Sequence, residues 1–242
     1  MDYFYLFIVS FFSNLFSAFS GGGAGIIQLP VILLLFEITF PVALATHKIS
    51  TVLLGLGASL KFFENNRPKN KLIKDGLLIG LPAVIIGALS ISFIDGEIAK
   101  KLLGILIFIV FILSFVKNKS QTQNTASPIV EYFLLFIIGF LNGSLSAGTG
   151  LLYTLMLTKL YGMSFKEAVG YTLLIIGLFF NLIGAVTLYL ISSIDLSILP
   201  VLLIGSFIGG YVGAIFAISR SNKIIKMSYQ LVTLIIAAKL LF

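Results

Sequence analysis

Long apolar runs alternate with short polar stretches along the chain, and this pattern predicts transmembrane helices. A helix needs about 20 apolar residues to cross the hydrocarbon core of a bilayer. Eight runs, of 19 to 34 residues, are close to that length or exceed it. We therefore expect an all-α membrane protein with short loops. The runs cover residues 3–36, 40–63, 76–94, 98–116, 132–158, 167–191, 196–218 and 224–242.

Glycine-rich segments interrupt two of these runs. Residues 20–25 read Ser-Gly-Gly-Gly-Ala-Gly, and residues 144–150 read Ser-Leu-Ser-Ala-Gly-Thr-Gly. A straight helix over 3–36 would be about 50 Å long against a core of about 30 Å, and glycine does not stabilise a helix. Each interrupted run is therefore predicted to form a helical hairpin with an unwound tip, which gives 8 to 10 hydrophobic segments in total.

The composition excludes a water-soluble enzyme. Hydrophobic residues make up 59% of the chain and charged residues only 10%, whereas soluble domains carry about 25% charged residues. The absence of cysteine excludes thiol catalysis and thiolate metal sites. With one histidine as well, we expect no metal and no cofactor. We interpret the net charge of +7 as a loop bias of a membrane protein, not as a sign of nucleic-acid binding.

Lysine and arginine in short loops favour the cytoplasmic side, so their distribution tests the hairpins. Eight single crossings would divide the loop cations eight against seven. With hairpins at 3–36 and 132–158 the division becomes twelve against three, which favours the hairpins and places both termini outside the cytoplasm. The predicted cytoplasmic cations are Lys61, Arg67, Lys69, Lys71, Lys74, Lys117, Lys119, Lys159, Lys166, Arg220, Lys223 and Lys226, and the opposite ones are Lys100, Lys101 and Lys239.

The second half of the chain repeats the first. A shift of 125 residues aligns Gly23 with Gly148 and Gly25 with Gly150. Each half then contains a hairpin and three crossings, and this odd number predicts an inverted repeat. The predicted domains are a first transmembrane repeat at 1–116, a cytoplasmic linker at 117–128 and a second, inverted transmembrane repeat at 129–242.

The glycine breaks are the predicted anion-binding elements. In inverted-repeat transporters, broken helices meet near the midplane and aim their N-termini at anionic substrates. The second arms begin near Gly25 and Gly150, where backbone N–H groups lack helical partners. The alternative interpretation is that these glycines only allow close helix packing, and we assign that role to Gly139, Gly143, Gly205, Gly209 and Gly213.

Three consecutive polar residues, Thr46, His47 and Lys48, follow the first hairpin and lie inside the next predicted crossing. An ionisable side chain there costs about 2.5–3.5 kcal/mol on insertion scales and usually faces a polar cavity. Lys48 would attract the anion and His47 would carry a coupled proton; alternatively, Lys48 reaches the interface by snorkelling. The predicted substrate-binding residues are Gly21, Gly22, Gly23, Gly25, Gln28, Thr46, His47, Lys48, Ser146, Gly148, Thr149, Gly150, Tyr153, Tyr171 and Thr172.

The two glycine breaks also resemble those of a known family. The segments at 20–30 and 142–150, each followed by a run of small residues (Ala43–Thr46 and Ala168–Tyr171), are similar to the TauE/SafE family of sulfite exporters and toluene sulfonate uptake permeases. The resemblance covers the whole chain, although Leu155 stands where the first half has Pro30. It implies secondary transport of small sulfur-containing anions such as sulfite, organosulfonates or thiosulfate.

The leading hypothesis is a proton-coupled anion transporter in the cytoplasmic membrane, whose partners are the small anion and the lipid bilayer. A passive channel for anions or small solutes uses the same elements and is the main alternative. An intramembrane serine protease would need Ser144 or Ser146 with His47, but the Gly-x-Ser-Gly context is absent. We therefore expect no enzymatic activity.

Overall fold

The computed structural model describes residues 2–65, 67–93 and 127–241, together with the single positions 98, 105, 108, 109 and 112. Apart from these five positions, the predicted crossing at 98–116 lies outside the described residues, and so does the predicted linker up to residue 126. Within the described residues every element is helical. The elements are α1 (Asp2–Ser20), α2 (Ala24–Leu35), α3 (Phe40–Phe62), α4 (Asn70–Ser90), η1 (Ile91–Phe93), α6 (Pro128–Leu145), α7 (Thr149–Leu160), α8 (Phe165–Thr172), η2 (Leu173–Phe180), α9 (Asn181–Ile191), α10 (Leu199–Ser219) and α11 (Asn222–Leu241).

Six of the described helices are long and apolar enough to cross a membrane. One of them combines α8, η2 and α9 into a single helix of 27 residues. This arrangement confirms the predicted all-α membrane protein. The six spans are Tyr3–Ser20, Phe40–Phe62, Asn70–Ser90, Pro128–Leu145, Phe165–Ile191 and Leu199–Ser219.

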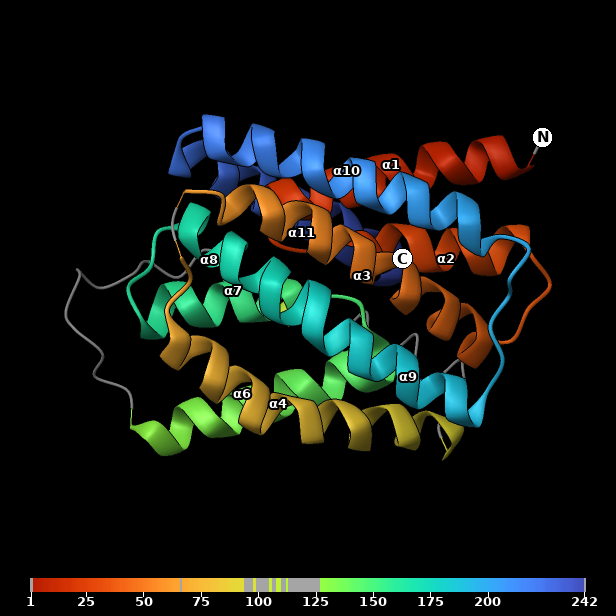
Figure 1. The fold of residues 1–242 in the computed structure, drawn as a ribbon, viewed down its shortest axis with the longest axis horizontal. Coiled ribbons are helices and arrows are strands. Elements are labelled where there is room, and N and C mark those ends of the chain that lie inside the picture. Colours follow the sequence, from red (N-terminus) through yellow and green to blue (C-terminus); the bar gives the residue numbers. More distant parts are fainter. Residues whose placement is uncertain are drawn as a thin grey trace.

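Both predicted helix breaks are present. The first falls between α1 and α2 at residues 21–23, and the second between α6 and α7 at residues 146–148. We call these segments the first tip and the second tip. At each tip the chain turns back, so that α2 returns toward the end from which α1 came, and α7 does the same beside α6 (Figure 1). The two hairpins enter from opposite ends of the bundle.

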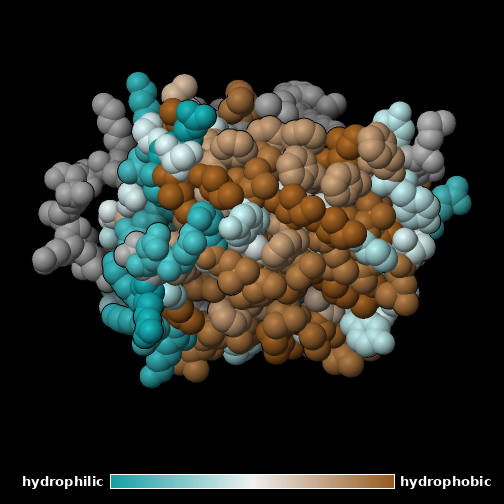
Figure 2. Space-filling model, turned by 45° about the horizontal axis from the view of Figure 1, so that its top comes forward, coloured by the Kyte–Doolittle hydropathy of each residue, from teal (hydrophilic) through white to brown (hydrophobic). Residues whose placement is uncertain are grey.

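The connections that carry or adjoin basic residues gather at one end of the bundle. The connections at 63–69, 161–164 and 220–221 lie together at the left in Figure 1, opposite the N-terminus and the connections at 36–39 and 192–198. Hydrophilic residues cover this left end in Figure 2, whereas the flank of the bundle is apolar. We call it the basic end because it carries Lys61, Arg67, Lys69 and Lys166. Which membrane side it faces stays a prediction.

Glycines allow two helix pairs to pack closely. Helix α10 packs on α1, where a Cβ at Gly209 would lie 2.3 Å from the carbonyl oxygen of Phe11. Helix α6 packs on α4, where a Cβ at Gly143 would lie 2.1 Å from the carbonyl oxygen of Val84. The packing role predicted for these glycines is therefore confirmed.

These two helix pairs bear on the predicted repeat. A shift of 125 residues superimposes α1 on α6 and α4 on α10 in the sequence. Each half therefore contributes one helix to each pair, as an inverted repeat requires. The repeat and its domain boundaries themselves stay predictions.

A π-helical segment, η2, was not predicted from the sequence. It lies in the middle of the span at 165–191, where a Cβ at Gly55 of α3 would lie 2.3 Å from the carbonyl carbon of Gly177. Segments of π-helix are rare and occur frequently at functional sites. This one leads directly into Asn181, the polar residue that follows the apolar segment Leu173–Phe180.

Candidate functional site

The two tips contact each other inside the bundle. A Cβ at Gly22 would lie 2.8 Å from the backbone nitrogen of Leu151, and one at Gly150 would lie 2.8 Å from the carbonyl oxygen of Gly21. The Thr154 hydroxyl donates a hydrogen bond of 3.2 Å to that same carbonyl of Gly21. The beginning of α7 is thereby held against the first tip.

A small cavity of about 40 Å³ lies between the tips. We call it the central cavity. A cavity needs about 10–15 Å³ to hold one water molecule, so this one matches about three waters or one small oxyanion. Its lining comes from both tips and from α1, α2, α3, α6, α7, α8, η2 and α9: Ser17, Gly21, Gly22, Gly23, Gly25, His47, Thr51, Leu54, Asn142, Ser146, Gly148, Thr149, Gly150, Thr172, Leu173, Ile176, Gly177 and Asn181.

Two helices begin at this cavity. Gly23 precedes α2 and Gly148 precedes α7, and no side chain caps either N-terminus within the described residues. The first N–H groups of a helix have no acceptor inside the helix, and the helix dipole is positive there. The two N-termini therefore favour an anion in the central cavity.

Ser146 in the second tip has an unusual backbone conformation. Its φ angle is 61°, and it is the one described residue other than glycine with a positive φ. Residues held in such sparsely populated conformations cluster at functional sites. Here the conformation allows α6 to end and α7 to begin three residues later, with the Ser146 carbonyl accepting a 2.8 Å hydrogen bond from the Thr149 hydroxyl.

The ammonium group of Lys48 is buried beside the cavity, and no carboxylate of the described residues pairs with it. Lys48 is fully buried, and its Nζ donates to Asn142 Oδ1 at 3.1 Å and to Asn181 Oδ1 at 3.3 Å. The ion pairs of the described chain are Lys61–Glu64 and Lys69–Glu167, both elsewhere. The snorkelling interpretation of Lys48 is therefore wrong. Its positive charge lies behind two asparagines that line the central cavity.

Hydrogen bonds fix the orientation of His47. Its Nδ1 lies 3.1 Å from Gln28 Oε1, and Gln28 Nε2 donates to the hydroxyls of Ser10 and Ser50 at 3.2 and 3.1 Å. Because an amide oxygen only accepts, this network assigns a proton to Nδ1 of His47. Its Nε2 then faces Gly25, where a Cβ would lie 3.2 Å away.

The structure brings together ten of the fifteen predicted site residues. These ten line the central cavity: Gly21, Gly22, Gly23, Gly25, His47, Ser146, Gly148, Thr149, Gly150 and Thr172. Two others lie one layer behind it, Gln28 against His47 and Lys48 against the two asparagines.

The remaining three predicted residues lie away from the cavity. The Thr46 hydroxyl accepts a 3.0 Å hydrogen bond from the backbone N–H of Asp195, in the connection at 192–198. Tyr153 is buried in an apolar cluster that contains Phe180. The Tyr171 hydroxyl accepts a 2.6 Å hydrogen bond from the backbone N–H of Lys69 at the basic end.

Sequence reasoning missed four polar side chains of the cavity, those of Ser17, Thr51, Asn142 and Asn181. Asn142 and Asn181 hold Lys48, and Asn181 also donates a 3.0 Å hydrogen bond to the Thr51 hydroxyl. Each asparagine stands in an apolar run, where a polar side chain is costly unless it has a partner. The cost of burying an asparagine in an apolar run could have marked Asn142 and Asn181 as functional candidates. It could not have identified Lys48 as their partner.

A polytopic bundle in which two interrupted helices meet at a buried polar cavity has the architecture of a membrane transporter. The comparison of sequences gives the family. The chain matches the family described as "Sulfite exporter TauE/SafE" over residues 6–240, and it belongs to that family.

Curated relatives agree with this assignment. A "Probable membrane transporter protein ORF9" of Sinorhizobium sp is 25% identical, over 98% of this chain and 91% of the relative. The "Probable membrane transporter protein YdhB" of Bacillus subtilis is 28% identical over 97% and 98%, and a "Probable membrane transporter protein" of Haemophilus influenzae is 26% identical over 98% and 93%. No solved structure gives a significant match.

Proposed function

We propose that this protein is a secondary transporter of small sulfur-containing anions, of the sulfite, organosulfonate or thiosulfate class, across the cytoplasmic membrane. The anion binds in the central cavity between the two tips. The backbone N–H groups at the starts of α2 and α7 hold it, and the Ser146 hydroxyl adds a neutral polar contact.

One observation carries this proposal: the buried ammonium of Lys48 beside a cavity whose described lining contains no carboxylate. A buried charge is costly unless a counter-charge or polar groups compensate it. Two amide oxygens compensate Lys48 only partly, because they carry no net charge. A bound anion completes the compensation, whereas a cation would add to the cost.

The size of the cavity favours a compact substrate in this conformation. The volume of about 40 Å³ accommodates an oxyanion with four or five heavy atoms. The tips enclose it, so a larger organosulfonate would require them to separate. The description of the family as sulfite exporters supports the same substrate class.

Proton coupling is assigned to His47. Its Nε2 has a free lone pair toward the cavity when Nδ1 donates to Gln28. A proton bound there is stabilised by an anion beside it and destabilised by the nearby Lys48 charge when the anion leaves. Proton and anion binding are thereby favourably coupled.

The orientation follows from the positive-inside rule. The basic end faces the cytoplasm, and both termini lie on the opposite side. The gathering of the connections at 63–69, 161–164 and 220–221 at one end supports this orientation (Figure 1). The relatives' names support transport rather than catalysis.

A thermal-shift panel on the purified protein tests the substrate class. A ligand that binds only the folded state raises the unfolding temperature by mass action. Sulfite, sulfate, thiosulfate, taurine and sulfoacetate are compared with chloride at equal ionic strength. We expect stabilisation by at least one sulfur-containing anion and none by chloride. A flat panel would remove sulfur anions as the substrate class.

A further inference from the structure

A second, larger cleft opens at the basic end of the bundle. Its volume is about 570 Å³, and its walls come from the end of α3, the connection at 63–69, the start of α8 and the end of α10. We call it the basic-end cleft. It is more than ten times as large as the central cavity and accommodates a hydrated anion or an organosulfonate.

The lining of the basic-end cleft has a positive net charge. Four cationic side chains and two carboxylates line it, which leaves two positive charges. Both carboxylates are paired, Glu64 with Lys61 and Glu167 with Lys69. The surplus of two positive charges attracts anions, so their local concentration in the cleft is raised.

Only a thin layer separates the cleft from the central cavity. Gly170 and Tyr171 line the cleft, whereas the next residue, Thr172, lines the cavity. A Cβ at Gly170 would lie 3.0 Å from the ring of Phe62. The rings of Tyr171 and Phe63 pack edge to face with centroids 5.4 Å apart. Aromatic side chains thus close the passage at α8.

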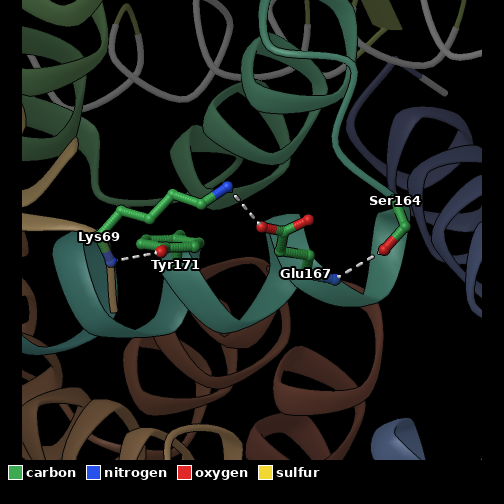
Figure 3. Close-up of polar contacts among 4 residues, drawn as sticks. All are labelled: Lys69, Ser164, Glu167 and Tyr171. Carbon is green, nitrogen blue, oxygen red and sulfur yellow. Dashed lines mark hydrogen bonds and ion pairs between the residues drawn. The ribbon is translucent and has the colours of Figure 1, made fainter. Parts of the chain in front are cut away.

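Lys69 makes two contacts that hold this layer closed between the cleft and the cavity. The backbone N–H of Lys69, the residue before α4, donates a 2.6 Å hydrogen bond to the Tyr171 hydroxyl. The Lys69 ammonium lies 3.3 Å from a Glu167 carboxylate oxygen (Figure 3). Figure 3 shows both partners on α8, whose start Ser164 caps through the backbone N–H of Glu167. Lys69 therefore joins the connection at 63–69 to α8.

The ion pair is suited to repeated opening. The side chains of Lys69 and Glu167 are 67% and 41% exposed, and ion pairs at such exposure are weak and screened by salt. Breaking the Lys69–Glu167 ion pair therefore adds little to the free energy needed to move α4 away from α8.

We propose that the basic-end cleft is the vestibule through which anions reach the central cavity, and that the contacts of Lys69 with Glu167 and Tyr171 form its gate. This inference rests on the proposed function for the identity of the anion. The gate itself controls how fast a reagent reaches the central cavity, and this rate is measured without a transport assay.

Access is measured by the labelling of a single cysteine in the central cavity. The natural chain has no cysteine, so Ser17→Cys, a conservative change at a residue that lines the cavity, gives a unique reporter. The reagent is the membrane-impermeant anion 2-sulfonatoethyl methanethiosulfonate, applied to inverted and to right-side-out vesicles. A separate Ser221→Cys protein identifies the vesicles in which the basic end faces the reagent.

Four changes are compared in the Ser17→Cys background. Glu167→Gln removes the ion pair, and Tyr171→Phe removes the hydroxyl but keeps the ring that packs on Phe63. Glu64→Gln is the matched control, because it makes the same charge change in the same cleft. Its partner Lys61 lies on the adjacent turn, so this pair joins no separate elements. The exchange of Lys69→Glu with Glu167→Lys restores the ion pair in reverse.

We expect Glu167→Gln and Tyr171→Phe to label about two- to fivefold faster from the basic end, the change that loss of one weak contact produces. Glu64→Gln reports the gain that one added positive charge gives an anionic reagent, so it should accelerate labelling less than Glu167→Gln, and the charge exchange should label at the parent rate. Equal acceleration by Glu64→Gln, or no acceleration by either gate change, would overturn the gate. Should Glu167→Gln fail to insert, Tyr171→Phe decides alone.

Protection by methanesulfonate separates this inference from the proposed function, because this small organosulfonate reacts neither with the thiosulfonate reagent nor with the labelled cysteine. Methanesulfonate in the central cavity should slow the labelling of Ser17→Cys in the parent protein. Acceleration by the gate changes without this protection would keep the gate and contradict the proposed substrate class.

Discussion

The Nδ1 atom of His47 lies 3.1 Å from the Oε1 atom of Gln28, deep in the bundle and directly behind the central cavity. Gln28 cannot rotate its amide without losing two hydroxyl acceptors, Ser10 and Ser50. The imidazole is consequently held with Nε2 toward the first tip. This single contact places the one titratable group that reaches the described cavity lining next to the N-terminus of α2.

Replacement of His47 should separate anion exchange from proton coupling. His47→Gln retains hydrogen-bonding capacity but binds no proton, so uptake driven by a pH gradient should be lost. Counterflow of sulfite between two equal pools should continue, because it needs no net proton movement. Both are measured with sulfite labelled with ³⁵S in proteoliposomes. Gradient-driven uptake that persists in His47→Gln would exclude His47 as the coupling residue.

Removal of the buried ammonium should weaken anion binding without unfolding the protein. Lys48→Met keeps the length of the side chain and removes its charge. Lys48 acts on the anion through space from behind the two asparagines, and two unit charges about 8 Å apart interact by about 2 kcal/mol at an effective dielectric constant of about 20, so the half-saturating sulfite concentration should rise about 10- to 100-fold. The anion-free protein should unfold at the same or a higher temperature, since an incompletely compensated buried charge is lost.

Lys74→Met is the control for Lys48→Met, because Lys74 is exposed on α4 away from the cavity. It should leave both the half-saturating concentration and the unfolding temperature unchanged. A lower unfolding temperature for Lys48→Met with unaltered affinity would show that Lys48 serves the fold alone.

The second tip should tolerate no side chain at its glycine cap. Gly148 has a φ angle of 79°, where a Cβ costs about 1–2 kcal/mol and would crowd an anion at the start of α7. Gly148→Ala should therefore abolish transport and lower the unfolding temperature modestly; the bulkier Gly148→Val should do both more strongly.

Gly162 provides the matched control for Gly148. Its φ angle is 63° and nothing lies within 4 Å of its would-be Cβ. Gly162→Ala should impose a similar backbone cost and leave transport intact. Should both alanine variants lose transport equally, backbone strain and not anion contact would be the cause.

Cysteine labelling tests the orientation of the bundle. Ser221→Cys at the basic end and Ser193→Cys in the connection at 192–198 are both exposed, conservative changes in a chain without cysteine. In intact cells an impermeant thiol reagent should label Ser193→Cys and spare Ser221→Cys. The reverse pattern would invert the topology.

Much of this arrangement follows from the sequence. The glycine breaks predicted both tips, and the starts of α2 and α7 to within one residue, because an interrupted apolar run longer than a bilayer span must turn back. Most residues named for the site lie together because they belong to those tips or follow them directly. His47 and Lys48 were identifiable as ionisable groups inside a span.

The rest depends on contacts between distant segments. The 125-residue alignment placed Tyr171 at the level of the cavity, but its hydroxyl bonds Lys69, 102 residues away, at the basic end. The run Leu173–Phe180 contains only apolar residues and glycine, so no periodicity distinguished a π-helix from an α-helix. The partners of Lys48, Asn142 and Asn181, are likewise set by tertiary packing.

The position of the bound anion is the most direct test of the account. Selenite, the selenium analogue of sulfite, gives an anomalous signal in crystals grown with it. We predict one selenium peak between Gly23 and Gly148, within hydrogen-bonding distance of the first backbone N–H groups of α2 and α7. A peak confined to the basic-end cleft, or no ordered selenium in the bundle, would contradict the binding of the anion between the two tips.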